Sequence, residues 1–268
     1  MKISTFASAA LLMTVGCHTN QDTRFTRRHP LETRVVSMAA APSPLTIDLR
    51  KTAVIVVDMQ NDFVKKGGLL DRIGFSVAGM QKIVPPIQET LSLSRKAGLP
   101  IVYLKMGYRP DLSDIGSEDS PMGVENRRVH VGEKMLAPDG REGRLLVRDT
   151  WNTDIVEELK PQPGDIVVYK TRYSGFYNTE LDTVLKRRGI RTLIMMGGTT
   201  SVCLESTLRD AMFRDYTPVI LSDCAAEPIG EELPWSNHEA TLLLIREAPF
   251  GAVSKSADFV KAISVWLR

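Results

Sequence analysis

Short apolar runs alternate with helical patterns from residue 52 onward, and this alternation limits the folds that the chain can adopt. It is typical of a parallel sheet built from strand, helix, strand units. Strands of such a sheet are buried on both faces, so they are continuous apolar runs. We therefore predict an α/β fold with a six-stranded parallel sheet, with strands at Ala53–Val57, Pro100–Leu104, Asp165–Tyr169, Thr192–Met196, Pro218–Leu221 and Phe250–Val253.

Amphipathic patterns between these runs predict helices, and one long polar stretch interrupts the pattern. That stretch, Lys105–Thr150, contains three prolines and several glycines. Insertions of this length in compact domains are usually lids or binding loops, so we expect it to form the wall or cap of a pocket. The predicted helices are Pro85–Ala97, a run from Thr179 to Gly189, a run that begins at or just before Cys203, Ser236–Glu247 and Ser256–Trp266.

Charge and cysteine content exclude several classes of function. The 268 residues carry 34 Lys plus Arg against 32 Asp plus Glu, a net charge of +2, which gives no basic footprint for nucleic acid. Three cysteines, Cys17, Cys203 and Cys224, and four scattered histidines form neither a disulfide framework nor a metal-ligand spacing. We therefore expect a small-molecule site without a metal or other cofactor.

The N-terminal part of the chain differs from the rest. Residues 1–17 combine one Lys, an apolar run and small residues before Cys17, which is typical of a lipoprotein signal; a start codon placed too far upstream is the alternative. The run is too short to span a bilayer, which takes about 20 residues. Cleavage would make Cys17 a lipid anchor and the protein exported or periplasmic; otherwise we expect a cytoplasmic protein. Residues 18–46 are predicted as a linker or extension, and 47–268 as the folded domain.

Three polar residues directly follow predicted strands. Asp58 follows the first strand, Lys170 follows the third, and Cys203 follows the fourth across a short turn. Ligands of open parallel sheets bind outside the carboxyl ends of the strands, so these side chains are predicted to meet there. Taken singly, each has an ordinary structural explanation, and a free cysteine is most often a small buried hydrophobe. Together they indicate a nucleophilic thiol whose pKa a helix N-terminus and a nearby ammonium would lower toward neutrality.

The turn before Cys203 contains two glycines and two threonines, which allow close approach of the backbone to a ligand. It matches neither a dinucleotide fingerprint nor a phosphate loop. We expect it to form an oxyanion hole, with N–H groups near Thr199 and Cys203.

Three segments resemble the isochorismatase-like cysteine hydrolases: VIVVDMQNDF at 54–63, KTRYSGF at 170–176 and GGTTSVC at 197–203. The resemblance runs from about residue 50 to the C-terminus. Within the family the chain is most similar to the ureidoacrylate and biuret amidohydrolase branch, through PQPGDI at 161–166, RYSGF at 172–176 and ESTLRD at 205–210.

The resemblance implies a three-layer α/β/α, Rossmann-like domain that assembles as a homodimer or homotetramer. It implies a catalytic triad that maps onto Asp58, Lys170 and Cys203, and a cis peptide between Gly198 and Thr199. Nicotinamidases of this family have histidine metal ligands that are missing between His29 and His130 here, and true isochorismatases lack the cysteine. Ureidoacrylate enzymes have an Asn where this chain has Met106, which disfavours ureidoacrylate itself.

The predicted function is cysteine-dependent hydrolysis of a C–N bond in a small amide, ureido or carbamoyl substrate through a covalent thioacyl intermediate. Alternatives are an isochorismatase- or nicotinamidase-type hydrolase of another small molecule, a non-catalytic binding protein and a redox-sensing thiol. The residues predicted to shape the substrate pocket are Gln60, Phe63, Met106, Tyr108, Tyr173 and Phe176.

Overall fold

The computed structural model describes residues 34–267 and contains the predicted parallel sheet. Its strand order is β10-β9-β8-β3-β4-β7, and every neighbouring pair is parallel. All six predicted runs are confirmed as strands: β3 (Thr52–Val57), β4 (Ile101–Met106), β7 (Ile166–Lys170), β8 (Thr192–Gly198), β9 (Thr217–Ala226) and β10 (Ala252–Ser254).

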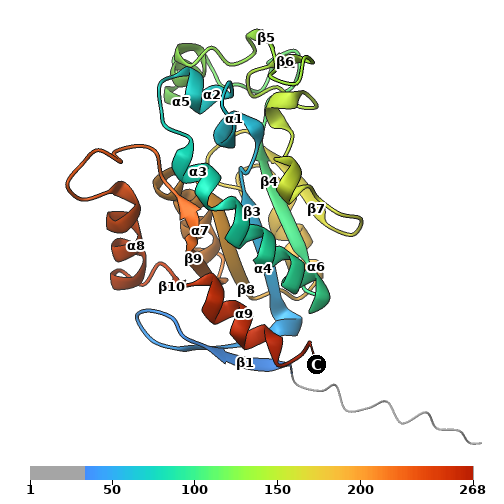
Figure 1. Cartoon of the computed structure of the whole chain (residues 1–268), viewed down its shortest axis with the longest axis vertical. Coiled ribbons are helices and arrows are strands. Elements are labelled where there is room, and N and C mark those ends of the chain that lie inside the picture. Colours follow the sequence, from blue (N-terminus) through green and yellow to red (C-terminus); the bar gives the residue numbers. More distant parts are fainter. Residues whose placement is uncertain (1–33, 268) are drawn as a thin grey trace, which may run out of the picture. The chain divides into compact units, whose positions relative to one another are not determined.

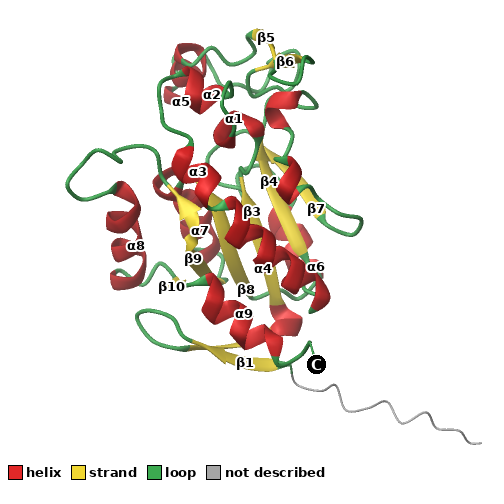
Figure 2. Cartoon of the chain, in the orientation of Figure 1, coloured by secondary structure: helices red, strands yellow, loops and turns green. Residues whose placement is uncertain are grey.

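The sheet lies between two layers of helices, which confirms the three-layer α/β/α fold (Figures 1 and 2). Side chains of β3 show why, because Val54 and Val56 enter one core while Ile55 and Val57 enter the other. A strand buried on both faces needs a helical layer on each. One face is covered by α3 (Ala78–Lys82), α4 (Val84–Lys96) and α9 (Ser256–Ser264), the other by α6 (Leu181–Arg187), α7 (Glu205–Met212) and α8 (Asn237–Glu247).

A short hairpin precedes the sheet within the segment predicted as a linker. Strands β1 (Val35–Met38) and β2 (Leu45–Asp48) pair antiparallel, and Val36 and Met38 are buried in the core that contains α9. Ala41 exchanges two backbone hydrogen bonds with Val253 at the edge of the sheet, with N···O distances of 2.8 and 3.0 Å. Residues 34–46 therefore pack onto the domain and are not a plain linker. The signal and the anchor predicted at residues 1–17 lie outside the described residues, as do residues 18–33.

The polar insertion 107–150 is more ordered than its composition predicts. It contains α5 (Pro121–Arg128), β5 (Lys134–Leu136) and β6 (Glu142–Arg144), which lie beside α1 (Asn61–Val64) and α2 (Leu69–Arg72) at the carboxyl edge of the sheet (Figure 1). A small apolar core of its own includes Leu69, Tyr108, Val129 and Leu146. The remaining short helices are the 3₁₀ turns η1 (Leu49–Lys51), η2 (Trp151–Thr153) and η3 (Glu157–Leu159) and the π-helical turn η4 (Thr200–Leu204).

One buried carboxyl group ties the insertion to the sheet edge. Asp62 accepts hydrogen bonds from the backbone N–H of Leu69 at 3.1 Å, from the backbone N–H of Leu146 at 2.8 Å and from the amide of Asn152 at 2.6 Å. Asp62 thus fixes two segments that are far apart in the sequence. Burial raises the pKa of Asp62 from its ordinary 3.8 to about 7, against the lowering effect of these donors.

This raised pKa predicts a pH dependence of stability. Because the folded state binds the Asp62 proton more tightly than the unfolded state, the stabilisation is complete below about pH 4 and is lost as pH rises to about 7. Chemical unfolding of wild type and Asp62→Asn over pH 4–8 measures the difference in free energy. We expect that difference to shift across this window in favour of the variant as pH rises, and a pH-independent difference would contradict the assignment.

Candidate active site

Asp58 occupies the turn directly after the central strand β3. Its backbone has a positive φ of 52°, an uncommon value for a residue with a side chain. Two hydrogen bonds to the neighbouring strand fix it: its N–H donates to Leu104 O at 3.0 Å, and its carboxylate accepts from the N–H of Met106 at 2.9 Å. The carboxylate is thereby held at the sheet edge, with the residue only 2% exposed.

Lys170 ends β7 and brings its ammonium group to the same point. Its Nζ lies 2.7 Å from Asp58 Oδ2 and 3.2 Å from Cys203 Sγ. The Nζ also donates to Arg172 O at 3.3 Å and contacts Met106 Sδ at 3.7 Å. The three residues that the sequence predicts as a triad therefore meet around one ammonium group.

Cys203 lies in the π-helical turn η4, which leads from β8 into α7. The thiol is buried, and burial raises its pKa to about 12; Lys170 lowers this pKa and Asp58 raises it. The sequence predicted the opposite direction, because it showed the helix and the lysine but neither the depth of burial nor the carboxylate beside the sulfur. This direction favours the protonated thiol, which would need a base to remove its proton before it could act as a nucleophile.

Lys170 stays in its protonated, charged form although it is buried. Burial by itself opposes the ammonium form, but the charge of the Asp58 carboxylate, with the hydrogen bond to Cys203, outweighs it and raises the pKa of Lys170. A buried pair of this kind is stable only while both partners are present.

The turn before Cys203 is shaped by close packing of the backbone. Gly197 has φ +114°, and a Cβ on it would lie 2.1 Å from Val57 O, so only glycine fits. The peptide bond between Gly198 and Thr199 is cis, at the position that the family resemblance implies. The N–H of Thr199 has no hydrogen-bond partner among the described residues 34–267, as an oxyanion donor would require.

Glu227 and His238, which the sequence analysis did not select, form hydrogen bonds to this turn. Glu227 accepts hydrogen bonds from the N–H and the hydroxyl of Ser201 at 2.7 and 2.6 Å. His238 Nδ1 lies 2.9 Å from the hydroxyl of Thr200. Glu227 directly follows β9, so the strand-end rule that selected Asp58 would have found it. The sequence prediction ended that strand at Leu221, five residues too early.

A cavity of about 350 Å³ opens onto the triad, with Asp58 and Cys203 in its wall. Of the residues predicted to shape the pocket, Phe63, Met106 and Tyr173 line it. Its other lining residues come mainly from α2, α5 and the insertion, so the predicted wall function of 105–150 agrees with the geometry.

Three residues predicted for the pocket are not part of its lining, and each has another structural task. The amide of Gln60 exchanges two hydrogen bonds with the backbone of Met106, at 2.8 and 2.7 Å. Tyr108 is fully buried, and its hydroxyl bonds to Asn126. Phe176 packs in the core behind the sheet, where its ring stacks on Tyr216 with centroids 5.8 Å apart.

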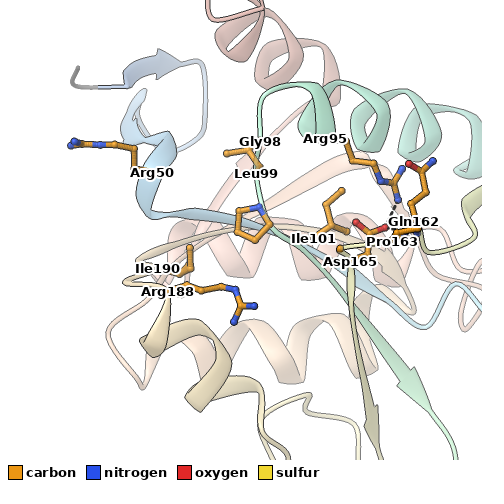
Figure 3. Close-up of a pocket in the computed structure, with 12 residues that line it drawn as sticks. Arg50, Arg95, Gly98, Leu99, Ile101, Gln162, Pro163, Asp165, Arg188 and Ile190 are labelled. Atoms are coloured by element: carbon orange, nitrogen blue, oxygen red, sulfur yellow. Dashed lines mark hydrogen bonds and ion pairs between the residues drawn. The ribbon is translucent and has the colours of Figure 1, made fainter. Parts of the chain in front are cut away.

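A larger hollow of about 600 Å³ lies at the opposite, amino-terminal edge of the sheet (Figure 3). Arg95 points toward Asp165 there, and their ion pair spans 2.6 Å. No cysteine, serine or histidine lines this hollow within the described part of the chain. It offers no nucleophile, so the chemistry belongs to the smaller cavity.

Neither a metal cluster nor a membrane helix is found among residues 34–267. No group of three or more His, Cys, Asp or Glu side chains there could hold a metal ion. No helix in that range is long and apolar enough to cross a membrane.

The fold and the site define the class as a cysteine hydrolase with a three-layer α/β/α fold, in which the buried thiol lies beside an Asp–Lys pair. The isochorismatase domain family matches residues 52–257, and the chain belongs to this family. It is 42% identical over 230 residues to the ureidoacrylate amidohydrolase of Caulobacter segnis, covering 86% of this chain and 93% of that one. The corresponding protein of Rhizobium rhizogenes is 40% identical, with coverages of 85% and 90%.

Solved structures support the same assignment. A cysteine hydrolase from Pseudomonas syringae pv. phaseolicola aligns with a TM-score of 0.68 at 32% identity, covering 82% of this chain and 95% of that one. N-carbamoylsarcosine amidase from Thermoplasma acidophilum aligns with a TM-score of 0.57 at 27% identity, with coverages of 77% and 96%. The protein is therefore a hydrolase of the isochorismatase family.

Gly197→Ala tests the packing of the turn. We expect the free energy of unfolding to fall by at least about 2 kcal/mol, since the positive φ and the contact with Val57 O are both unfavourable. Gly98→Ala is the control, because Gly98 has a positive φ of 72° but nothing within 4 Å of an added Cβ, and it should cost about 1 kcal/mol. Equal losses in chemical denaturation would contradict the close approach.

Lys170→Met tests the buried ion pair. Leaving the Asp58 carboxylate without its partner should cost about 3–5 kcal/mol in chemical denaturation. Combining it with Asp58→Asn should recover part of this loss, since the isolated buried charge is then removed. Additive losses in the double variant would show that the two groups do not interact.

Proposed function

We propose that the protein hydrolyses a C–N bond of a small amide, ureido or carbamoyl substrate with Cys203 as nucleophile. The observation that carries this proposal is the position of Lys170 Nζ, 2.7 Å from Asp58 and 3.2 Å from Cys203, two residues that line the cavity. A thiol, a carboxylate base and a third orienting group satisfy the general arrangement for nucleophilic catalysis. The names of the relatives, amidohydrolase and N-carbamoylsarcosine amidase, support amide and ureido chemistry.

The first half of the reaction forms the thioacyl intermediate. Asp58 removes the proton from Cys203 as the sulfur forms a bond to the substrate carbonyl carbon. The carbonyl oxygen becomes an oxyanion, which the N–H groups of Thr199 and Cys203 stabilise. The C–N bond then breaks, and Asp58 gives its proton to the leaving nitrogen, which departs as ammonia or an amine.

The second half releases the acyl or carbamoyl group. Asp58, again a carboxylate, takes a proton from water, and the resulting hydroxide attacks the thioester or thiocarbamate carbon. The C–S bond breaks and the proton returns to sulfur. Lys170 stays protonated throughout, and its charge balances first Asp58 and then the developing thiolate.

The raised pKa of Cys203 bears on the redox-sensor alternative. Sensors use an exposed thiol of low pKa near a resolving cysteine. Here the thiol is buried with a raised pKa, and Cys224, the other free cysteine among the described residues, is buried in the core on the opposite face of the sheet. Hydrolysis therefore fits the site better than redox sensing.

Cys203→Ala tests the proposed function. Ammonia release from biuret, ureidoacrylate, an N-carbamoyl amino acid and simple amides should fall at least about 1,000-fold, because no other thiol lines the cavity among the described residues. Cys224→Ala is the matched control and should keep wild-type kcat. Equal turnover by wild type and Cys203→Ala would contradict the proposal and leave a protein that only binds its ligand.

A further inference from the structure

We propose that the substrate of this site is uncharged and carries an apolar group, such as an aliphatic or aromatic chain attached to the amide or urea. This inference rests on the proposed function, since it names the substrate class of the same cavity. It excludes substrates with a carboxylate on that group, including ureidoacrylate, as preferred substrates.

The wall of the cavity is apolar away from Cys203. Apolar side chains converge on it from α2, from the end of β4, from α5 and from the insertion. Most of them are firmly packed, with Leu69, Met106 and Leu146 each 4% exposed. The apolar residues that face the cavity from these elements include Leu69, Ile73, Met106, Met122, Val129 and Leu146.

No unpaired cation lines the cavity among the described residues. The charged side chains in its wall are Asp58, Glu125 and Arg128. Arg128 makes a two-bond pair with Glu125, at 2.8 and 2.7 Å, and its side chain is 65% exposed at the rim. This hydrogen bonding lowers the pKa of Glu125, so that both groups stay charged and compensate each other. Lys170 is compensated by Asp58.

Asn126, a buried amide in the wall, has its hydrogen bonds satisfied within the protein. Asn126 donates to Ile115 O at 2.7 Å and to the hydroxyl of Tyr108 at 2.9 Å, and its Oδ1 lies 3.1 Å from the same hydroxyl. It is 3% exposed. A substrate carboxylate placed here would lose its water without gaining a partner, which is strongly unfavourable. The polar groups of the wall that could contact a substrate are thus those near Thr199 and Cys203 and the neutral hydroxyl of Tyr173, none of which carries a positive charge.

The size of the cavity sets the size of the apolar group. A dry cavity of about 150 Å³ accepts benzene, and this one measures about 350 Å³. It holds a scissile amide or urea together with a ring or a chain of several carbons. Each buried methylene contributes enough to raise kcat/KM about fourfold until the space is filled.

Two substrate series of equal length test this inference. One consists of butanamide, hexanamide and octanamide with the corresponding N-alkylureas; the other consists of the same chains ending in a carboxylate, with ureidoacrylate alongside. We expect kcat/KM to rise about fourfold per methylene in the neutral series, and each carboxylate to be at least about 100-fold poorer. Equal or better turnover of the carboxylates would overturn the inference. If that turnover is then lost in Arg128→Gln, the Arg128 guanidinium is the group that binds the carboxylate.

A variant at the cavity mouth tests the charge argument directly. Ile229→Lys places a cation at a lining residue that is 37% exposed, so the fold tolerates it, and should reduce the preference for neutral substrates at least about 10-fold. Leu233→Lys is the control, since Leu233 lies on the same segment but outside the lining and is 51% exposed. An unchanged preference in Ile229→Lys would contradict the charge argument.

Binding to Cys203→Ala separates the two proposals. Calorimetric titration of this variant with hexanamide, hexylurea and the matching carboxylates reports ligand class without turnover. If the variant binds the neutral compounds but wild type does not hydrolyse them, the proposed function is contradicted, while the inference that the ligand is neutral and apolar stands. Hydrolysis with a preference for carboxylates would retain the function and overturn the ligand class.

Discussion

The buried ion pair between Asp58 and Lys170 is the interaction on which the site depends. Removing two charges from water is costly, and such a pair is stable only where the attraction between the two groups offsets that cost. The 2.7 Å contact requires β3 and β7 to end at the same edge, with β4 between them. Met106 at the end of β4 completes the arrangement, because its N–H binds the carboxylate and its sulfur contacts the ammonium. The sheet order therefore brings together the three residues that we propose for catalysis.

Cys203 joins this pair through a turn that the sheet edge holds from two sides. Gly197 allows the turn to lie directly against Val57, and Glu227 at the end of β9 binds the N–H and hydroxyl of Ser201. Burial raises the pKa of this thiol, so the proposed reaction includes removal of its proton by the carboxylate beside it.

The insertion connects substrate choice to the fold. Its polar composition faces solvent, while its few apolar residues gather into a small core that also forms the cavity wall. Asp62 holds that wall by binding backbone groups of α2 and of the segment around Leu146. Arg128, which lines the cavity, is paired with Glu125, and on our proposal this pairing makes it a poor anion site. The proposed chemistry thus belongs to the sheet edge, and the proposed substrate selectivity belongs to the insertion.

The sequence by itself determined the sheet, since short apolar runs that alternate with amphipathic helical patterns are typical of parallel strands between helical layers, and all six runs were recognisable. It also indicated Asp58, Lys170 and Cys203, because residues that follow parallel strands share one edge. The β1 hairpin was missed because four alternating residues carry too weak a period. Only the tertiary structure decided that Gln60 braces β4, that Phe176 belongs to the core and that the pKa of Cys203 rises. Each of these depends on burial and on partners distant in the chain, which local sequence patterns do not encode.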